Sequence, residues 1–194
     1  MLKYALILLL LVVAPLGAAT REYEIKAGFI YNFLRFVDWP TPRTGWTVGI
    51  FGSDPFEGAL AELEARPLSG KSIRVMVVKS VAEAKNCDVV YIGPSESSRF
   101  GQHINSLKGA DVLTVSDIPE FADKGGVIGL FTERNRVRFN VNLDALKSAN
   151  LKANARFLQL ASRTISLFPE ELLPQVSFER PEDNQLIEQL FGAP

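Results

Sequence analysis

Apolar residues between Arg21 and Val37 recur at the spacing of an α-helix and form two overlapping stripes. The helix should end before Pro40, because proline disfavours helical geometry at the residue that precedes it. Two stripes are more apolar surface than one packed face needs. We expect the core of the domain to cover part of this surface, and a second subunit is the alternative cover. The candidate dimer contacts are Phe29, Ile30, Phe33 and Phe36.

Strand and helix patterns then alternate along the chain as far as residue 115. Apolar runs predict strands at 48–51, 73–78, 89–92 and 112–115. Helical spacing predicts helices that begin at Asp54-Pro55, cover 81–85, and carry Phe100, Ile104 and Leu107. The run at 73–78 is rich in β-branched residues, which is typical of a strand covered on both faces. The alternation predicts an α/β fold with a mostly parallel sheet and helices on both faces.

Two further runs, 127–131 and 136–141, predict strands joined by a loop too short for a crossover helix. They should therefore pair antiparallel as a C-terminal hairpin. In the second run Arg136, Arg138 and Asn140 alternate with apolar residues and share one face. We take these three as a candidate partner-binding surface, because arginine forms paired hydrogen bonds with carboxylates. The alternative is a solvated face that protects an edge of the sheet from aggregation.

The two ends of the chain differ in pattern from this domain. Lys3, a short apolar run and the small residues at 17–19 are typical of a secretory signal peptide, so residues 1–19 should be removed. The apolar run is shorter than the roughly 17–25 residues that span a bilayer. Helical patterns at 143–149 and 153–168 complete a single α/β domain over residues 20–168. Periodicity weakens after Pro169, and we assign 169–194 to a C-terminal tail.

Residues that metal and catalytic sites require are scarce. The chain has one histidine, His103, and one cysteine, Cys87, so neither a histidine-rich nor a thiolate metal site is expected. His103 has no nucleophile-elbow sequence nearby, and we expect a surface or half-buried helix residue. Cys87 precedes an apolar strand and should be a buried thiol. A formal net charge of −1 gives no attraction for nucleic acid. We predict no catalytic site, no metal and no cofactor.

Small polar residues follow three predicted strands, in Gly52-Ser53-Asp54, Gly93-Pro94-Ser95 and Ser116-Asp117. In open α/β sheets this carboxyl edge is where ligands bind. Amides at the start of the following helices attract phosphate or carboxylate groups. The candidate ligand-binding residues are therefore Ser53, Asp54, Ser95 and Asp117. Ordinary helix caps use the same residue types and are the simpler explanation.

Two long segments combine features that are specific when they occur together. The first, Lys26-Ala-Gly-Phe-Ile-Tyr-Asn-Phe-Leu-Arg-Phe-Val-Asp-Trp-Pro40, is an aromatic helix that ends in Trp-Pro. The second runs from Val112-Leu-Thr-Val-Ser-Asp117 through Gly125-Gly126, Ile128-Gly129, Val137-Arg-Phe139 and Asn142-Leu143 to Arg156-Phe157-Leu158. Together they resemble the YfiR-like family of periplasmic regulators over nearly the whole mature chain.

The resemblance implies a Rossmann-like or flavodoxin-like sheet, a periplasmic location and a homodimer. It also implies a function in binding, because the best-known relative inhibits a membrane diguanylate cyclase through its periplasmic region. That inhibition limits cyclic di-GMP and biofilm formation, and an outer-membrane lipoprotein relieves it by sequestration. A sensor kinase is an alternative partner, and a periplasmic small-ligand sensor is an alternative function. This chain departs from that relative in its cysteines, since Cys87 has no partner with which to form an internal disulfide.

Overall fold

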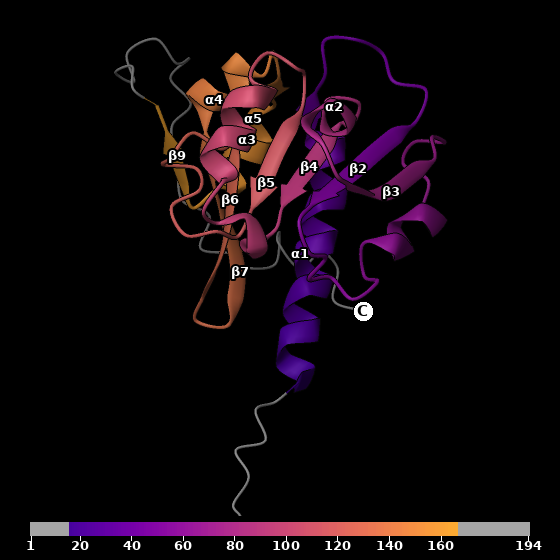
Figure 1. Ribbon diagram of the computed structural model, residues 1–194, viewed down its shortest axis with the longest axis vertical. Helices are drawn as coiled ribbons and strands as arrows, with labels where there is room; N and C mark the ends of the chain where they lie inside the picture. The colour runs from indigo at the N-terminus through magenta and orange to yellow at the C-terminus, as the bar shows by residue number, and fades with distance from the viewer. Residues whose placement is uncertain (1–15, 167–194) are drawn as a thin grey trace, which may run out of the picture.

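Seven strands form the central sheet in a computed structural model that describes residues 16–166 (Figure 1). Their order across the sheet is β3-β2-β4-β5-β6-β7-β9. The first five run parallel, β7 runs antiparallel to β6, and β9 lies parallel to β7. The parallel part has the strand order of flavodoxin-like sheets, so the predicted α/β fold is confirmed. The strands are β2 Trp46–Phe51, β3 Ile73–Val78, β4 Val89–Ile92, β5 Leu113–Ser116, β6 Ile128–Glu133, β7 Arg136–Asn142 and β9 Arg163–Ile165.

Helices cover both faces of this sheet (Figure 1). The long helix α1 packs on one face, and α2 and α3 pack on the other. The helices are α1 Leu16–Phe36, α2 Val81–Ala84, α3 Phe100–Leu107, α4 Leu143–Ser148 and α5 Ala155–Leu160, with the 3-10 helices η1 Ala61–Ala65 and η2 Pro94–Glu96. A separate two-stranded ribbon joins β1 (Val37–Asp38) to β8 (Lys152–Ala153). Within residues 16–166, no helix combines the length and the apolar content that crossing a bilayer requires.

The core has two parts because strand side chains alternate between the faces of the sheet. In β4, Val89 and Tyr91 face the α1 side, whereas Val90 and Ile92 face α2 and α3, and all four are buried. On the α1 side, four phenylalanine rings contact one another with centroids 5.2–6.0 Å apart. They are Phe29 and Phe33 from α1, Phe139 from β7 and Phe157 from α5. This cluster ties the N-terminal helix to the C-terminal part of the sheet.

The β6–β7 hairpin forms as predicted, with Glu133 opposite Arg136 at its end. Its two-residue turn places both Arg134 (φ 49°) and Asn135 (φ 60°) in the left-handed region. Turns of this kind match the right-handed twist of the flanking strands. The hairpin extends past the carboxyl ends of β4 and β5 (Figure 1). Strand β9 covers the outer side of β7, so β7 is the second strand from the edge.

The segment after Asp54 does not form the predicted α-helix. Turns and the 3-10 helix η1 occupy this part of the described chain. The backbone of Glu57 (φ 50°) and Gly58 (φ 98°) is left-handed, which interrupts a right-handed helix. The three apolar residues at helical spacing, Phe56, Leu60 and Leu63, are nevertheless buried in the core on the α1 side. The prediction from their spacing that these residues are buried is therefore confirmed, whereas the prediction that they lie on an α-helix is wrong.

Two other element predictions need correction. The helix expected over 153–168 ends at Leu160, and the chain then turns into β9, where Ser162 N donates to the carbonyl of Phe139 (2.8 Å). The expected cover on both faces of 73–78 is also wrong, because β3 is an edge strand and Val77 is 50% exposed. Residues 1–15 of the predicted leader and the predicted tail at 169–194 lie outside the described residues.

Candidate functional site

The carboxylate of Asp117 lies directly after β5, where it accepts three hydrogen bonds. The donors are Tyr23 Oη (2.9 Å), Lys26 Nζ (2.5 Å) and Tyr91 Oη (2.5 Å). Lys26 is only 3% exposed and forms a second ion pair with Glu22 (2.7 Å). A buried ammonium needs such partners, because an unpaired charge in the interior is costly. The cluster therefore clamps the N-terminal part of α1 to the carboxyl edge of the sheet.

The two tyrosines of this clamp are held in their neutral form. Burial raises the pKa of Tyr23 and of Tyr91, and the negative charge of Asp117 raises both further. Both phenols are consequently protonated and donate to Asp117. Asp117 accepts all three of these hydrogen bonds and so holds the clamp together. These contacts explain its position without a ligand, and its role in ligand binding stays a prediction.

The residues predicted at the ends of β2 and β4 hold the loops together. Ser53 N donates to Ser95 Oγ (2.9 Å), and Asp54 Oδ1 accepts from Phe56 N (2.8 Å). Gly52 has a φ of 92°, and a Cβ atom there would lie 2.4 Å from Ser95 Oγ. The side chain of Ser95 thus fills the space between these two strand ends. This is the point where the strand order reverses and where a ligand would be expected in a sheet of this class.

A second polar cluster at the same edge joins η2 to α3. Glu96 accepts hydrogen bonds from His103 Nε2 (2.8 Å) and from Arg99 (2.9 Å). These bonds, the one from His103 first, lower the pKa of Glu96. The ring of His103 also packs against Phe51, with centroids 4.1 Å apart. The prediction of a surface or half-buried His103 is therefore wrong: its pairing with Glu96 makes burial acceptable.

A cavity of about 650 Å³ lies beside the Asp117 clamp. We call it the hairpin groove. It brings together Asp117 and Asn140, which the sequence assigned to two separate candidate sites. It does not include Ser53, Asp54 or Ser95. Its principal lining residues are Glu22, Tyr23 and Lys26 from α1, Asp117 to Asp123, Gly129 to Thr132 from β6, Asn140 from β7 and Arg163 from β9.

Positive charge gathers along the hairpin next to this groove. Arg134 and Arg136 are exposed, and Arg138 is half-buried with its Nε 3.3 Å from Glu133 Oε2. Arg136, Arg138 and Asn140 share one face of β7, as the alternation predicted, because Val137, Phe139 and Val141 occupy the core. Within residues 16–166 no carboxylate pairs with Arg134 or Arg136. The end of the hairpin thus exposes two guanidinium groups that form no ion pair within residues 16–166.

The α1 residues predicted to form a dimer surface are mostly inside the chain itself. Phe29 is 3% exposed, and Ile30 and Phe33 are fully buried against the sheet. A second subunit cannot contact side chains that its own fold has already covered, so these three assignments are wrong. Phe36 is half-buried and stays a predicted contact.

The next feature is the placement of side chains that could bind a metal or act as a nucleophile. Within residues 16–166 no group of three histidine, cysteine, aspartate or glutamate residues is placed to hold a metal ion. Cys87 is buried, as predicted, and burial raises the pKa of its thiol to about 11. A thiol with this pKa is protonated at neutral pH and is a poor nucleophile.

The sequence did not single out several residues that matter at this edge. Tyr23, Lys26 and Tyr91 were hidden because their partner, Asp117, is far away in the sequence. The position of Lys26 could have indicated a buried partner, because it stands beside buried Ala27 on the apolar side of α1. Arg163 was missed because its segment was assigned to a helix. It forms two bonds of 2.7 Å to Asp123 at the wall of the groove.

A family described as YfiR/HmsC-like matches residues 23–162, a span that includes the Asp117 clamp and the whole hairpin. Among solved structures, a conserved domain protein from Vibrio cholerae is similar with a TM-score of 0.52 and 13% identity, covering 74% of this chain and 60% of that one. The ABC domain of Streptococcus pneumoniae, in complex with L-Trp, has a TM-score of 0.50 and 11% identity, covering 72% and 60%. The chain thus spans about 60% of the length of these two structures. At this identity the likeness concerns the α/β fold alone.

Proposed function

This chain belongs to the YfiR/HmsC-like family, and from that membership we propose that it inhibits a membrane signalling protein by binding its periplasmic region. Members of this family are periplasmic regulators that act with membrane signalling proteins and are not enzymes. A diguanylate cyclase is the target we propose, and the outcome of binding is a lower level of cyclic di-GMP. The chain is exported for this purpose by the leader at residues 1–19.

The observation that carries this proposal is the pair of uncompensated arginines at the end of the hairpin. Arg134 lies in the two-residue turn and Arg136 is the first residue of β7, so both lie at the exposed end of the hairpin. Arginine is enriched among residues that dominate binding energy, and its planar group pairs with two carboxylate oxygens at once. The matching partner surface is therefore acidic.

The hairpin groove extends this surface toward the body of the domain. Phe131 and Asn140 line it next to the hairpin, and Arg138 lies on the same strand face as Asn140. The lining of the groove mixes apolar side chains with charged and polar ones, and such a groove suits an inserted polar side chain of the partner. We propose that Arg136, Arg138 and Asn140 form the contact surface, with Arg134 as an added anchor.

The test is the affinity of the purified protein for the periplasmic region of the cyclase. The double variant Arg134→Ala/Arg136→Ala should bind at least roughly thirtyfold more weakly, the effect of losing one strong anchor. Arg156→Ala is the matched control, because Arg156 is an exposed arginine on α5, away from the hairpin. Its affinity should change by no more than about twofold.

Equal affinity of the double variant and the wild type would contradict the hairpin as the contact surface. If the protein binds the periplasmic domain of a sensor kinase and does not bind the cyclase, the hairpin remains the proposed contact surface but the proposed partner is wrong. An outer-membrane lipoprotein that sequesters the protein would compete for the same arginines.

A homodimer is also proposed, with Phe36 as a predicted contact, and light scattering at increasing concentration measures it.

A further inference from the structure

A second cavity, of about 410 Å³, lies beside α3, and its lining shares Asp123 with the hairpin groove. Its volume falls in the range of roughly 300–1,000 Å³ that small-molecule sites occupy. Most of its surface is apolar and comes from five elements or loops. The apolar residues that line it are Ile104, Leu107, Val112, Val127, Ala145, Ala149 and Ile165.

The polar groups of this cavity differ in whether they already have partners. Asn142 Oδ1 accepts from Ala145 N (2.8 Å), and its amide nitrogen donates to the carbonyl of Ala122 (2.7 Å). Asp123 pairs with Arg163, and Lys124 pairs with Glu120 (2.8 Å). Lys108 has no such partner among the described residues 16–166.

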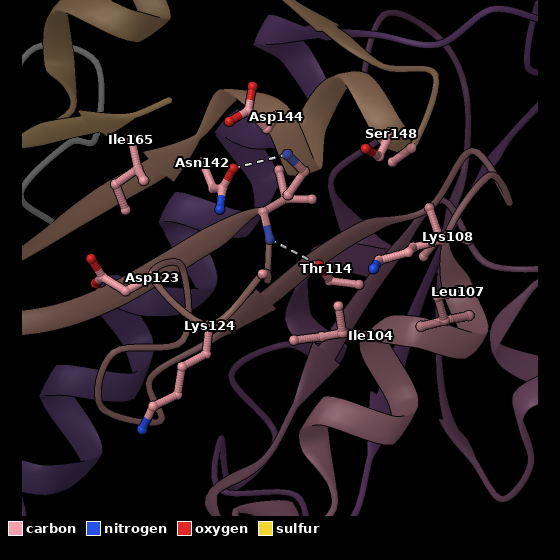
Figure 2. Close-up of a pocket in the computed structure, with 15 residues that line it drawn as sticks. Ile104, Leu107, Lys108, Thr114, Asp123, Lys124, Asn142, Asp144, Ser148 and Ile165 are labelled. Atoms are coloured by element: carbon pink, nitrogen blue, oxygen red, sulfur yellow. Dashed lines mark hydrogen bonds between the residues drawn. The ribbon is translucent and has the colours of Figure 1, made fainter. Parts of the chain in front are cut away.

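Thr114 supplies a second available donor in the same cavity. Its Oγ1 accepts a hydrogen bond from Val127 N (3.0 Å), and no described acceptor takes the proton of its hydroxyl group. Figure 2 shows the Lys108 side chain extending from the end of α3 toward Thr114, whereas the Lys124 side chain points away from the cavity. Lys108 and Thr114 therefore add an ammonium group and a hydroxyl donor to the lining of a mainly apolar cavity.

The acidic residues restrict the ligand further. Asp123 and Asp144 line the part of the cavity that lies opposite Lys108 (Figure 2). A second negative charge on the ligand would find no available cation at that end among residues 16–166, because Arg163 is already paired with Asp123. The cavity therefore favours a single anionic group on an apolar body.

We propose that this cavity binds a small monocarboxylate with a hydrocarbon body, whose carboxylate contacts Lys108 and the hydroxyl of Thr114. A carboxylate bonded to an ammonium forms a charge-assisted hydrogen bond, and the hydrocarbon leaves water for the apolar walls. Lys108 and Thr114 do not line the hairpin groove, so the proposed ligand contacts differ from the proposed partner contacts.

Titration of the purified protein with octanoate, followed by calorimetry and by amide NMR shifts, tests the proposal. We expect saturable binding with a dissociation constant below about 1 mM, as for other well-fitted small ligands. The shifted amides should surround Ile104 and Val127. The uncharged analogue 1-octanol should bind roughly tenfold more weakly, because it lacks the charge-assisted bond.

A pair of lysine variants separates the site from general charge effects. Lys108→Met should weaken octanoate binding roughly tenfold, whereas Lys124→Met removes the same charge from a residue that points away and should leave it unchanged. Both lysines are exposed, so both variants should fold. The proposal is overturned if octanoate does not saturate, if 1-octanol binds as tightly, if shifts map elsewhere, or if Lys108→Met binds like the wild type.

Discussion

Lys26 and Asp117 form a buried ion pair of the kind whose desolvation cost offsets much of its attraction. Such a pair adds little net stability compared with apolar residues, yet the loss of one partner leaves a charge without compensation. Here the pair also receives two tyrosine hydroxyl groups and a second carboxylate, from Glu22. The cluster therefore specifies where α1 meets the sheet, next to the hairpin groove.

Asp117→Asn should lower the free energy of unfolding by about 3 kcal/mol, because Lys26 loses its closest buried counter-charge. Asp54→Asn is the control, since Asp54 is exposed and asparagine accepts the same bond from Phe56 N. Its effect should stay within about 0.5 kcal/mol. Urea unfolding measures both. A loss for Asp117→Asn no greater than that of the control would mean that the clamp is dispensable.

Glu96 gives the fold a pH dependence. The hydrogen bond from His103, followed by that from Arg99, lowers the pKa of Glu96 in the folded state. A carboxyl group with a lowered folded pKa stabilises the protein above its unfolded pKa, and this contribution is lost as pH falls through the folded pKa. At pH 7, Glu96→Gln should therefore lower the free energy of unfolding by about 1–3 kcal/mol.

The difference between Glu96→Gln and the wild type should shrink as pH falls through the folded pKa of Glu96, because the wild-type carboxyl group then becomes protonated as well. Glu62→Gln is the matched control, because Glu62 is exposed on η1. Urea unfolding over a series of pH values from 7 downward measures the effect. A difference that stays constant over the whole series would show that ionisation of Glu96 contributes nothing.

At the scale of elements, the hairpin turn retains an unfavourable residue. Both turn positions are left-handed, which suits the pair Asn-Gly, whereas this chain has Arg134-Asn135. A residue such as arginine adopts this conformation at a cost of roughly 1–2 kcal/mol. The same conformation occurs in this chain at Glu57, Ser69, Asp111, Glu120 and Asn150, so it is not specific to Arg134. The proposed role of Arg134 as a binding anchor gives one reason for arginine at this position.

Arg134→Asn combined with Asn135→Gly should raise the free energy of unfolding by about 1 kcal/mol, because the turn then has its favoured residues. The same variant should bind the partner at least roughly tenfold more weakly, because it lacks an anchor. Asn135→Gly alone should gain stability and keep its affinity. Urea unfolding and a binding titration measure the two effects. If the variant that combines Arg134→Asn with Asn135→Gly binds the partner with wild-type affinity, Arg134 is not part of the contact surface.

Some elements of the fold could be predicted from the sequence and others could not. The hairpin and the parallel strands were predictable, because local alternation and apolar runs decide them. Strand β9 was not, because its three residues pair with β7 in a way that depends on distant parts of the chain. The turn at Glu57 and Gly58 had only a glycine to indicate it. The Asp117 clamp joins α1, β4 and the end of β5, and such contacts leave no local pattern.

At the scale of the whole molecule, two buried polar clusters lie at the carboxyl edge of the sheet, and the hairpin extends past this edge (Figure 1). Among the described residues this edge holds the Asp117 clamp, the Glu96 cluster and the hairpin groove. The hydrogen-bonding groups of the first two have partners inside the chain, and Tyr23, Lys26 and Asp117 of the clamp line the groove. The exposed arginines then present the surface that we propose a signalling protein recognises.

The central claim is that this protein holds a diguanylate cyclase inactive through its hairpin. The most direct measurement is cellular cyclic di-GMP in a strain that lacks the protein, complemented with wild type, with Arg134→Ala/Arg136→Ala or with Arg156→Ala at equal protein levels. The account predicts that cyclic di-GMP rises on deletion, and that wild type and Arg156→Ala restore the low level while the double variant does not. An unchanged level on deletion, or full restoration by the double variant, would contradict it.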